Sequence, residues 1–317
     1  MNANLLRYVG KRLLLSIPVL LGIAVVSFGL MYLAPGDVAQ ALLGDHATPE
    51  AIAQIQQQYN LDKPVWQQFT IWLGRVLRGD LGESFVSHKP VTEVIGQRLM
   101  VTVQLGFFAF VIALLGAIPL GVWSAVKRNR WQDHASRIIA LTGISIPDFW
   151  TGIVLMLAFG VFWPILPPGG YIPLSAGLWP NVKSLLLPSL ILGFVNMALI
   201  TRMLRSGMIE TLSQNYILAG RAMGVPERTL TWDDALRNAF IPTLTIIGLS
   251  LARLFGGAVM LETVFSLPGI GRLVAESVFN RDLPMIQATL LLIGAAYTFV
   301  NIFIDVLYTF IDPRIRH

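Results

Sequence analysis

Long apolar runs alternate with shorter polar segments along the chain. Six of the runs are long enough to cross a bilayer, because a helix needs about 20 residues to span about 30 Å of hydrocarbon. Lipid offers the backbone no hydrogen-bond partners, and the runs lack the strict alternation of barrel strands, so each one predicts a helix. The predicted transmembrane helices cover 13–33, 99–126, 138–163, 184–201, 238–261 and 283–304, and the last continues to about residue 311. The pattern therefore predicts an all-α, polytopic membrane protein.

The first apolar run has to be distinguished from a secretory signal peptide. It is longer than the apolar region of a signal peptide, and no cleavage site of small residues follows it. The next residues are typical of a turn, Ala34, Pro35, Gly36 and Asp37. We therefore expect a retained N-terminal transmembrane helix within residues 1–34.

Composition agrees with a membrane protein and excludes several other classes. Only 13% of the 317 residues are charged, against about a quarter in ordinary soluble domains. The chain has no cysteine, and its four histidines are scattered without metal-ligand spacing, so no disulfide, thiolate chemistry or metal site is predicted. No Ser/His/Asp arrangement indicates a catalytic residue. We interpret the net charge of +5 as a topology signal and expect no nucleic-acid partner.

Lysines and arginines orient the predicted helices. They concentrate in the N-terminal segment, in the second connection, in the fourth connection and in the tail, whereas the short connections on the other side carry only Lys183, Arg272 and Arg281. Short connections rich in lysine and arginine stay in the cytoplasm. Both termini and the segment between the fourth and fifth helices are therefore expected to be cytoplasmic.

The long loop 35–98 then lies on the other side of the membrane and has predicted helices of its own. Thr48 as N-cap and Pro49 at the first position predict a helix over 49–59. An apolar face predicts an amphipathic helix over 64–77. Two interpretations stay open, a cap that packs on the bundle and a platform for an external partner, and one does not exclude the other.

The segment 216–242 is a polar island between two apolar runs. Its residues predict a short helix from Tyr216 to Met223 that ends at Gly224, since glycine suits the left-handed position after a helix. Pro226 suits the first turn of a second helix, and Glu227 suits the positive end of that helix. Small side chains on the first helix leave room for another protein to approach; they belong to Ala219, Gly220 and Ala222. On these signals alone, a solvated loop is an equal alternative.

Motifs along nearly the whole chain resemble one family, the permease subunits of type-I ABC importers in the dipeptide, oligopeptide and nickel class. The similar stretches are KRLLLSIPVLLGIAVVSFGLMYLAPGD (11–37), LDKPVWQQFTIWL (61–73), RGDLGESF (78–85), SIPDFW (145–150), LITRMLRSGMIE (199–210), ETVFSLPGIGRL (262–273), NRDLPMIQA (280–288) and DPRIR (312–316). Each stretch is weak alone, and their order and spacing together make the resemblance specific. It implies the type-I ABC importer transmembrane fold and a place in a bacterial inner membrane.

The resemblance also implies a domain organisation. An N-terminal transmembrane helix (1–34) is followed by an extracytoplasmic helical loop (35–98). The type-1 transmembrane domain with five helices (95–311) contains a cytoplasmic coupling loop at 202–238. A cytoplasmic tail (312–317) ends the chain.

The polar island is similar to the coupling loop of this family, the EAA loop, which usually reads close to Asp-Tyr-x-x-Thr-Ala-Arg-Ala-Lys-Gly. The chain departs from this pattern at Asn215, Ala219, Gly220, Met223, Asp233 and Asp234. These departures concern the partner surface and leave the fold of the loop unaffected. The residues implied to couple the permease to an ATPase are Tyr216, Ala219, Gly220, Arg221, Ala222, Gly224 and Arg237.

The chain has no GxxxxGK[ST] phosphate loop, so it is not expected to bind or hydrolyse ATP by that mechanism. We therefore expect no cofactor in this chain and no enzymatic activity of its own. The resemblance implies one or two separate ATPase subunits that bind ATP and Mg²⁺. It also implies a second homologous permease subunit and an extracytoplasmic solute-binding protein, with lipid around the helices.

Two ionisable residues are candidates for the translocation path, Arg253 within the predicted fifth helix and Glu262 at its outer end. A charge within a membrane helix is costly and usually faces a cavity or a partner. Arg253 is interpreted either as a pathway residue that meets an anionic group of the substrate, or as a structural residue paired with Asp305 or reaching an interface. Glu262 precedes an ordered outer turn that forms part of a gate or of a binding-protein contact. For Asp305 we expect a packing role. Asp148 follows Pro147, where we expect the third helix to be broken near an interface, and a capping or hydrogen-bonding role is expected for it.

The substrate class is left open by the sequence. Peptides are the leading expectation, and nickel chelates, glutathione and opines are alternatives within the family. A secondary transporter that works without ATP is the alternative from another class, and a non-transporting scaffold is a further one. Secondary transporters often have internal inverted repeats and chains of intramembrane carboxylates. The sequence shows neither an obvious repeat nor such a chain.

Overall fold

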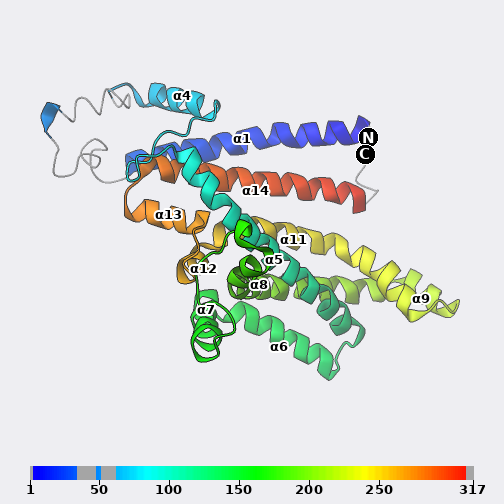
Figure 1. Cartoon of the computed structure of the whole chain (residues 1–317). Helices are drawn as coiled ribbons and strands as arrows, with labels where there is room; N and C mark the ends of the chain where they lie inside the picture. The colour runs from blue at the N-terminus through cyan, green and yellow to red at the C-terminus, as the bar shows by residue number, and fades with distance from the viewer. Residues whose placement is uncertain (1–2, 34–47, 51–61, 312–317) are drawn as a thin grey trace.

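The computed structural model describes residues 3–33, 48–50 and 62–311, and within these ranges the regular structure is helical. Long helices run side by side along one direction (Figure 1). Those long and apolar enough to cross a membrane contain or form α1 (Ala3–Leu33), α5 (Val91–Val126), α8 (Leu178–Leu212), α11 (Leu236–Gly257) and α14 (Leu283–Ile311). The predicted all-α membrane architecture is confirmed for the described part of the chain.

The third predicted helix, 138–163, is broken at Pro147, as the sequence predicts. The chain forms α6 (Trp131–Ser145), then α7 (Asp148–Met156), which continues as the π-helix η2 (Leu157–Phe162), and the two parts are bent by 96°. Pro147 causes the break, because it lacks an N–H and forces the residue before it out of the helical region. Ile146 is accordingly extended, with φ −90° and ψ 127°. Asp148 is the first residue of α7 and accepts a hydrogen bond of 2.8 Å from the N–H of Phe149, which fits a hydrogen-bonding role, whereas the N-cap position belongs to Pro147.

The fifth predicted helix, 238–261, also differs at its ends. It is preceded by the π-helix η4 (Leu230–Ala235), and α11 gives way near Ala258 to a separate short helix, α12 (Val259–Val264). The chain then turns into α13 (Ile270–Phe279) before α14. The apolar run therefore continues past the end of the long helix, and the hydropathy pattern alone does not show that boundary.

Close packing of α5 against α8 forms the centre of the bundle. Small buried residues recur every fourth position along α5, at Ala109, Ala113, Ala117 and Gly121, and such a stripe lets helix backbones approach closely. On α8, a Cβ atom added to Gly193 would lie 2.8 Å from the carbonyl oxygen of Ala109. The two helices are therefore held at a distance that only the smallest side chains allow.

The first helix packs along α14 (Figure 1). A Cβ atom added to Gly294 would lie 2.6 Å from the side chain of Ile23, so these two helices also meet at a glycine. Arg12 of α1 forms an ion pair of 3.0 Å with Asp305 of α14. The packing role expected for Asp305 is thus supported, and the alternative pairing of Asp305 with Arg253 is wrong.

The loop before α5 contributes α4 (Val65–Val76), which confirms the amphipathic helix predicted over 64–77. Its Phe69 and Trp72 rings contact Phe28 of α1 with ring centroids 5.4 Å apart in each case. Tyr32 donates a hydrogen bond of 2.6 Å to the side-chain oxygen of Gln68. The helix therefore caps the end of α1. Of the helix predicted over 49–59, only residues 49 and 50 are described, as helical, and the rest lies outside the described residues.

The two ends of the bundle differ in composition. The start of α1, the connection after α5, the segment between α8 and α11, and the end of α14 lie at the same end (Figure 1). This end carries the segments in which lysine and arginine concentrate, and we call it the basic end. The helices α4, α12 and α13 lie at the opposite end, which we call the outer end.

Candidate functional site

A compact group of short helices connects α8 to α11 at the basic end. It consists of α9 (Asn215–Ala222), α10 (Glu227–Thr229) and the π-helix η4. The helix predicted from Tyr216 to Met223 is confirmed to within one residue at each end. Gly224 adopts φ +79°, the left-handed conformation expected of it, and Pro226 precedes α10 as its cap. We call residues 213–238 the coupling segment.

One face of the coupling segment is built into the bundle. Ile217 of α9 is 0% exposed and packs in a buried cluster with Leu230 of the same segment. Other members come from the ends of the three long helices, among them Val122 of α5, Leu204 of α8 and Ala239 of α11. A displacement of α9 is therefore transmitted to α5, α8 and α11 together, because close-packed interiors are nearly incompressible.

Gly220 also faces inward, which corrects the expectation that its small size leaves room for another protein. The residue is buried, and an added Cβ atom would lie 2.8 Å from the side chain of Leu230. Its small size therefore allows α9 to pack against η4 within the chain. The other residues implied to couple this chain to an ATPase are exposed, namely Tyr216, Ala219, Arg221, Ala222, Gly224 and Arg237.

Two polar contacts hold the exposed part of the coupling segment. Arg221 donates two hydrogen bonds to the carboxylate of Glu227, at 2.5 and 3.1 Å, and so bridges the turn at Gly224. This hydrogen bonding raises the pKa of the Arg221 guanidinium. Asn238 of α11 donates a hydrogen bond of 3.0 Å to the hydroxyl of Tyr216. The exposed face is thus a shaped surface that belongs to a rigid segment, which excludes the solvated-loop alternative for its structure.

A buried ionic group near the coupling segment was not predicted from the sequence. Asp133 of α6 is 1% exposed and accepts hydrogen bonds from Arg205 of α8 at 2.6 and 2.7 Å. Ser124 of α5 donates a further bond of 2.7 Å, and the backbone N–H of Asn129 one of 3.0 Å. This group joins α5, α6 and α8 at the basic end. The residues were visible in the sequence only as an acid and a base 72 positions apart, which no local pattern pairs.

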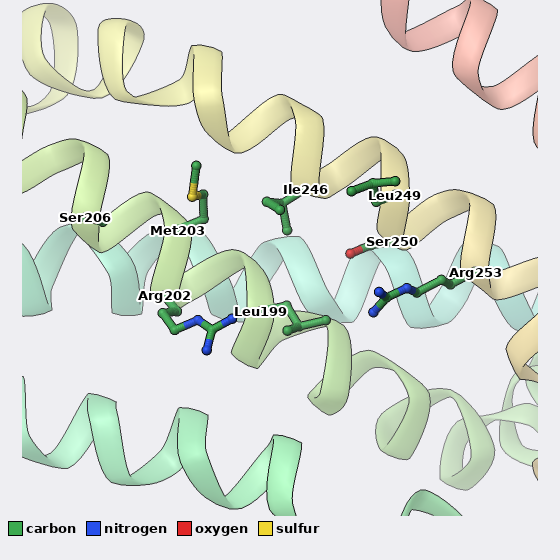
Figure 2. A pocket seen from close by; sticks show the side chains of 8 residues that line it. All are labelled: Leu199, Arg202, Met203, Ser206, Ile246, Leu249, Ser250 and Arg253. Atoms are coloured by element: carbon green, nitrogen blue, oxygen red, sulfur yellow. The ribbon is translucent and has the colours of Figure 1, made fainter.

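A groove of about 370 Å³ lies between α8 and α11 on the face shown in Figure 2. Its lining residues are Leu199, Arg202, Met203, Ser206, Ile246, Leu249, Ser250 and Arg253. Arg253, predicted as a candidate for the translocation path, therefore faces an open groove together with a second arginine, Arg202. No hydrogen bond or ion pair to another described residue engages either guanidinium group.

Glu262, the other candidate for the translocation path, is enclosed at the outer end and is 0% exposed. Its carboxylate accepts a hydrogen bond of 2.7 Å from Thr102 and one of 2.8 Å from the N–H of Arg272. Thr102 in turn accepts a bond of 2.8 Å from the N–H of Ile270. Together the two side chains satisfy N–H groups in the first turn of α13, which an N-cap normally does. In this conformation Glu262 therefore supports the outer turn and does not face an open path.

Glycines in the outer turn make this arrangement possible. A Cβ atom added to Gly269 would lie 2.2 Å from the Glu262 carboxylate, and one added to Gly271 would lie 2.8 Å from the backbone of Val259. Burial raises the pKa of Glu262, and its hydrogen bonds oppose that shift. The LPGIGR stretch singled out in the sequence is thus the backbone that surrounds a buried carboxyl group.

Comparison with known proteins assigns the chain to a family. Residues 117–317 match the family described as the binding-protein-dependent transport system inner membrane component, and residues 5–106 match the N-terminal part of such membrane components. The chain is 38% identical to the dipeptide transport system permease protein DppB of Alkalihalophilus pseudofirmus, over 99% of this chain and 100% of that protein. It is 36% identical to the protein of the same name in Escherichia coli K12, over 99% of each.

A third relative is a putative peptide transport system permease protein of Brucella abortus, which is 39% identical over 97% of this chain and 98% of that protein. The matches cover the coupling segment, the groove and the outer turn alike. The chain therefore belongs to the family of binding-protein-dependent transport system inner membrane components, the multi-pass permease subunits of ABC importers with the type-I fold.

Proposed function

We propose that this chain forms half of the translocation path of an ATP-driven importer of peptides. The relatives named as dipeptide or peptide transport permeases support this substrate class. The observation that carries the proposal is the coupling segment, because one of its faces is exposed and the other is packed into three long helices. A separate ATPase subunit would bind the exposed face and move the membrane helices through the packed face.

The proposed mechanism needs no chemistry in this chain. One or two ATPase subunits bind ATP and Mg²⁺ and change their separation during the cycle. Because Ile217 is fully buried among the ends of α5, α8 and α11, those helices move with α9 as one body. Rigid-body motion of this kind switches an importer between outward-open and inward-open states. A second, homologous permease subunit supplies the other half of the path, and a solute-binding protein delivers the peptide at the outer end.

The orientation of the chain follows from its charge distribution. The basic end carries the lysine- and arginine-rich connections, and such connections stay in the cytoplasm. We therefore place both termini and the coupling segment in the cytoplasm, and α4, α12 and α13 on the outer side. The buried outer turn around Glu262 would then stabilise the closed outer side of the path.

The proposal is tested by uptake into proteoliposomes that contain this chain, its permease partner and its ATPase subunits. Ala219→Trp places a bulky group on the exposed face of α9, and His134→Trp places the same group on exposed α6 at the same end. We expect Ala219→Trp to abolish ATPase association and ATP-dependent uptake, and His134→Trp to leave both intact. Uptake that needs only an ion gradient and no ATPase would show instead that the chain is a secondary transporter.

A further inference from the structure

The α8–α11 groove contains two positive charges, and one of them, Arg253, lies at membrane depth. At 1.5 Å per helical residue, Arg253 lies about 25 Å along α11 from the basic end, and Arg202 lies about 15 Å from the end of α8. Both side chains are exposed and line the same groove, with Leu199 between them in the view of Figure 2. An ionisable residue at such a depth normally faces a water-filled cavity or meets a partner of opposite charge.

Among the described residues, no acidic side chain lines the groove. Elsewhere in the described bundle, Arg205 pairs with Asp133 and Arg12 pairs with Asp305. The groove differs from these two sites. Its charges lack a carboxylate among the described residues, while its remaining wall is apolar apart from Ser206 and Ser250.

We propose that Arg202 and Arg253 form a subsite for the carboxylate of the transported solute. The proposal rests on the peptide-import function proposed above and names the group that the path recognises, which is the C-terminal carboxylate of a peptide. Guanidinium groups match the planar geometry of a carboxylate and bind it with charge-assisted hydrogen bonds. The apolar wall from Leu199, Ile246 and Leu249 accepts side chains of varied size without selecting one.

Two exposed arginines in an open groove also suit transport better than a closed pocket would. The groove is open, and both guanidinium groups are exposed, so water continues to screen the attraction. A carboxylate is then held weakly enough to leave. The positive potential attracts anionic groups into a path that would otherwise be lined by hydrocarbon.

The absence of cysteine from the chain allows a direct test. Ser206→Cys places a single thiol in the groove, and the complex is assembled in nanodiscs of phosphatidylcholine. The thiol is then modified by an anionic sulfonate and by a cationic trimethylammonium methanethiosulfonate reagent. The cysteine-free chain in the same complex gives the background from the partner subunits.

We expect the anionic reagent to react faster than the cationic one. Arg202→Gln and Arg253→Gln should each lower the ratio of the two rates by about twofold or more at physiological ionic strength. Arg253→Lys should keep most of the ratio, because it keeps the charge. The matched control is Arg137→Gln on α6, which removes an exposed arginine outside the groove and should leave the ratio unchanged.

A pair of acetylated dipeptides tests the ligand itself. N-acetyl-Ala-Ala should lower the rate ratio, and N-acetyl-Ala-Ala-amide, which lacks the carboxylate, should not. Equal effects of the two peptides, or a ratio insensitive to both arginine substitutions, would overturn the carboxylate subsite. A fall in the ratio that appears only when anionic lipid replaces phosphatidylcholine would assign the arginines to lipid phosphate and also overturn it. ATP-driven uptake by the wild-type complex is measured separately, so failure of the import function is distinguished from failure of the subsite.

Discussion

The buried pair Asp133–Arg205 offers the sharpest test of how the basic end is held together. Asp133→Asn removes the negative charge and leaves a side chain of nearly the same shape. The carboxylate accepts two hydrogen bonds from Arg205, one from Ser124 and one from the N–H of Asn129. An amide has one acceptor oxygen and one donor group, so at least one of the four donors then faces another donor.

The magnitude follows from this loss. Breaking a buried ion pair by removing one partner destabilises a protein by about 3–5 kcal/mol. Arg205 is 22% exposed at its side chain, so water partly solvates the charge that is left behind, and we expect the lower end, about 3 kcal/mol. Arg205→Gln should have an effect of similar size. The double variant should lose less than the sum of the two, because the second substitution removes a charge that no longer has a partner.

The assay is the rate of thermal inactivation of the purified complex, since unfolding of a membrane complex is irreversible and a rate is then the proper measure. The control is Arg272→Gln, which breaks a partly exposed ion pair with Glu276 at the outer end and should leave the inactivation rate nearly unchanged. The view that this pair joins α5, α6 and α8 would be refuted if Asp133→Asn were inactivated at the wild-type rate. It would also be refuted if the effect of the double variant equalled the sum of the two single effects.

Four further predictions concern other parts of the molecule. Gly269→Ala should destabilise the outer turn by more than about 2 kcal/mol, since its Cβ would overlap the buried Glu262 carboxyl group; the melting temperature in detergent checks this, and a wild-type value would contradict it. The pKa of Glu262 is raised in the folded state, so the folded protein binds the proton of this carboxyl group more tightly than the unfolded chain does. The contribution of Glu262 to stability is therefore highest below the ordinary carboxyl pKa and falls as the pH rises through the raised pKa. In a series of melting temperatures measured against pH, Glu262→Gln should abolish this fall. Ile217→Ala should cost about 2–4 kcal/mol of local stability and reduce uptake per ATP hydrolysed, whereas loss of ATPase binding with unchanged coupling would contradict the proposed role of its packed face. Gly224→Ala is strained at φ +79° and should weaken ATPase association by about 1 kcal/mol, measured by co-purification at graded salt.

Much of the coupling segment was predictable from local residues. The end of α9 at Gly224 follows from the freedom of glycine at positive φ, and the start of α10 follows from the geometry of Pro226. These effects act within a few residues and need no information about the rest of the chain. The same reasoning failed for Gly220, because its environment is set by Leu230, ten residues later and in another helix.

The bend between α6 and α7 shows a second limit. Pro147 predicted a break in the third helix, but hydropathy does not distinguish a slight kink from a bend of 96°. The physical cause is local, since proline removes an N–H and restricts Ile146. The direction of the second part depends on its contacts with α8 and α12, which are distant in sequence.

The sequence by itself determined the class of protein, the positions of most membrane helices and the polar segment that leaves the bundle, because hydropathy, lysine and arginine placement and turn residues act locally. Only the tertiary structure decided which charges meet. It paired Asp133 with Arg205 and Asp305 with Arg12, buried Glu262 beneath α13, and left Arg202 and Arg253 together in an open groove. Charged side chains at membrane depth depend on whatever partner lies within a few ångströms, and the packing of helices far apart in sequence sets that distance.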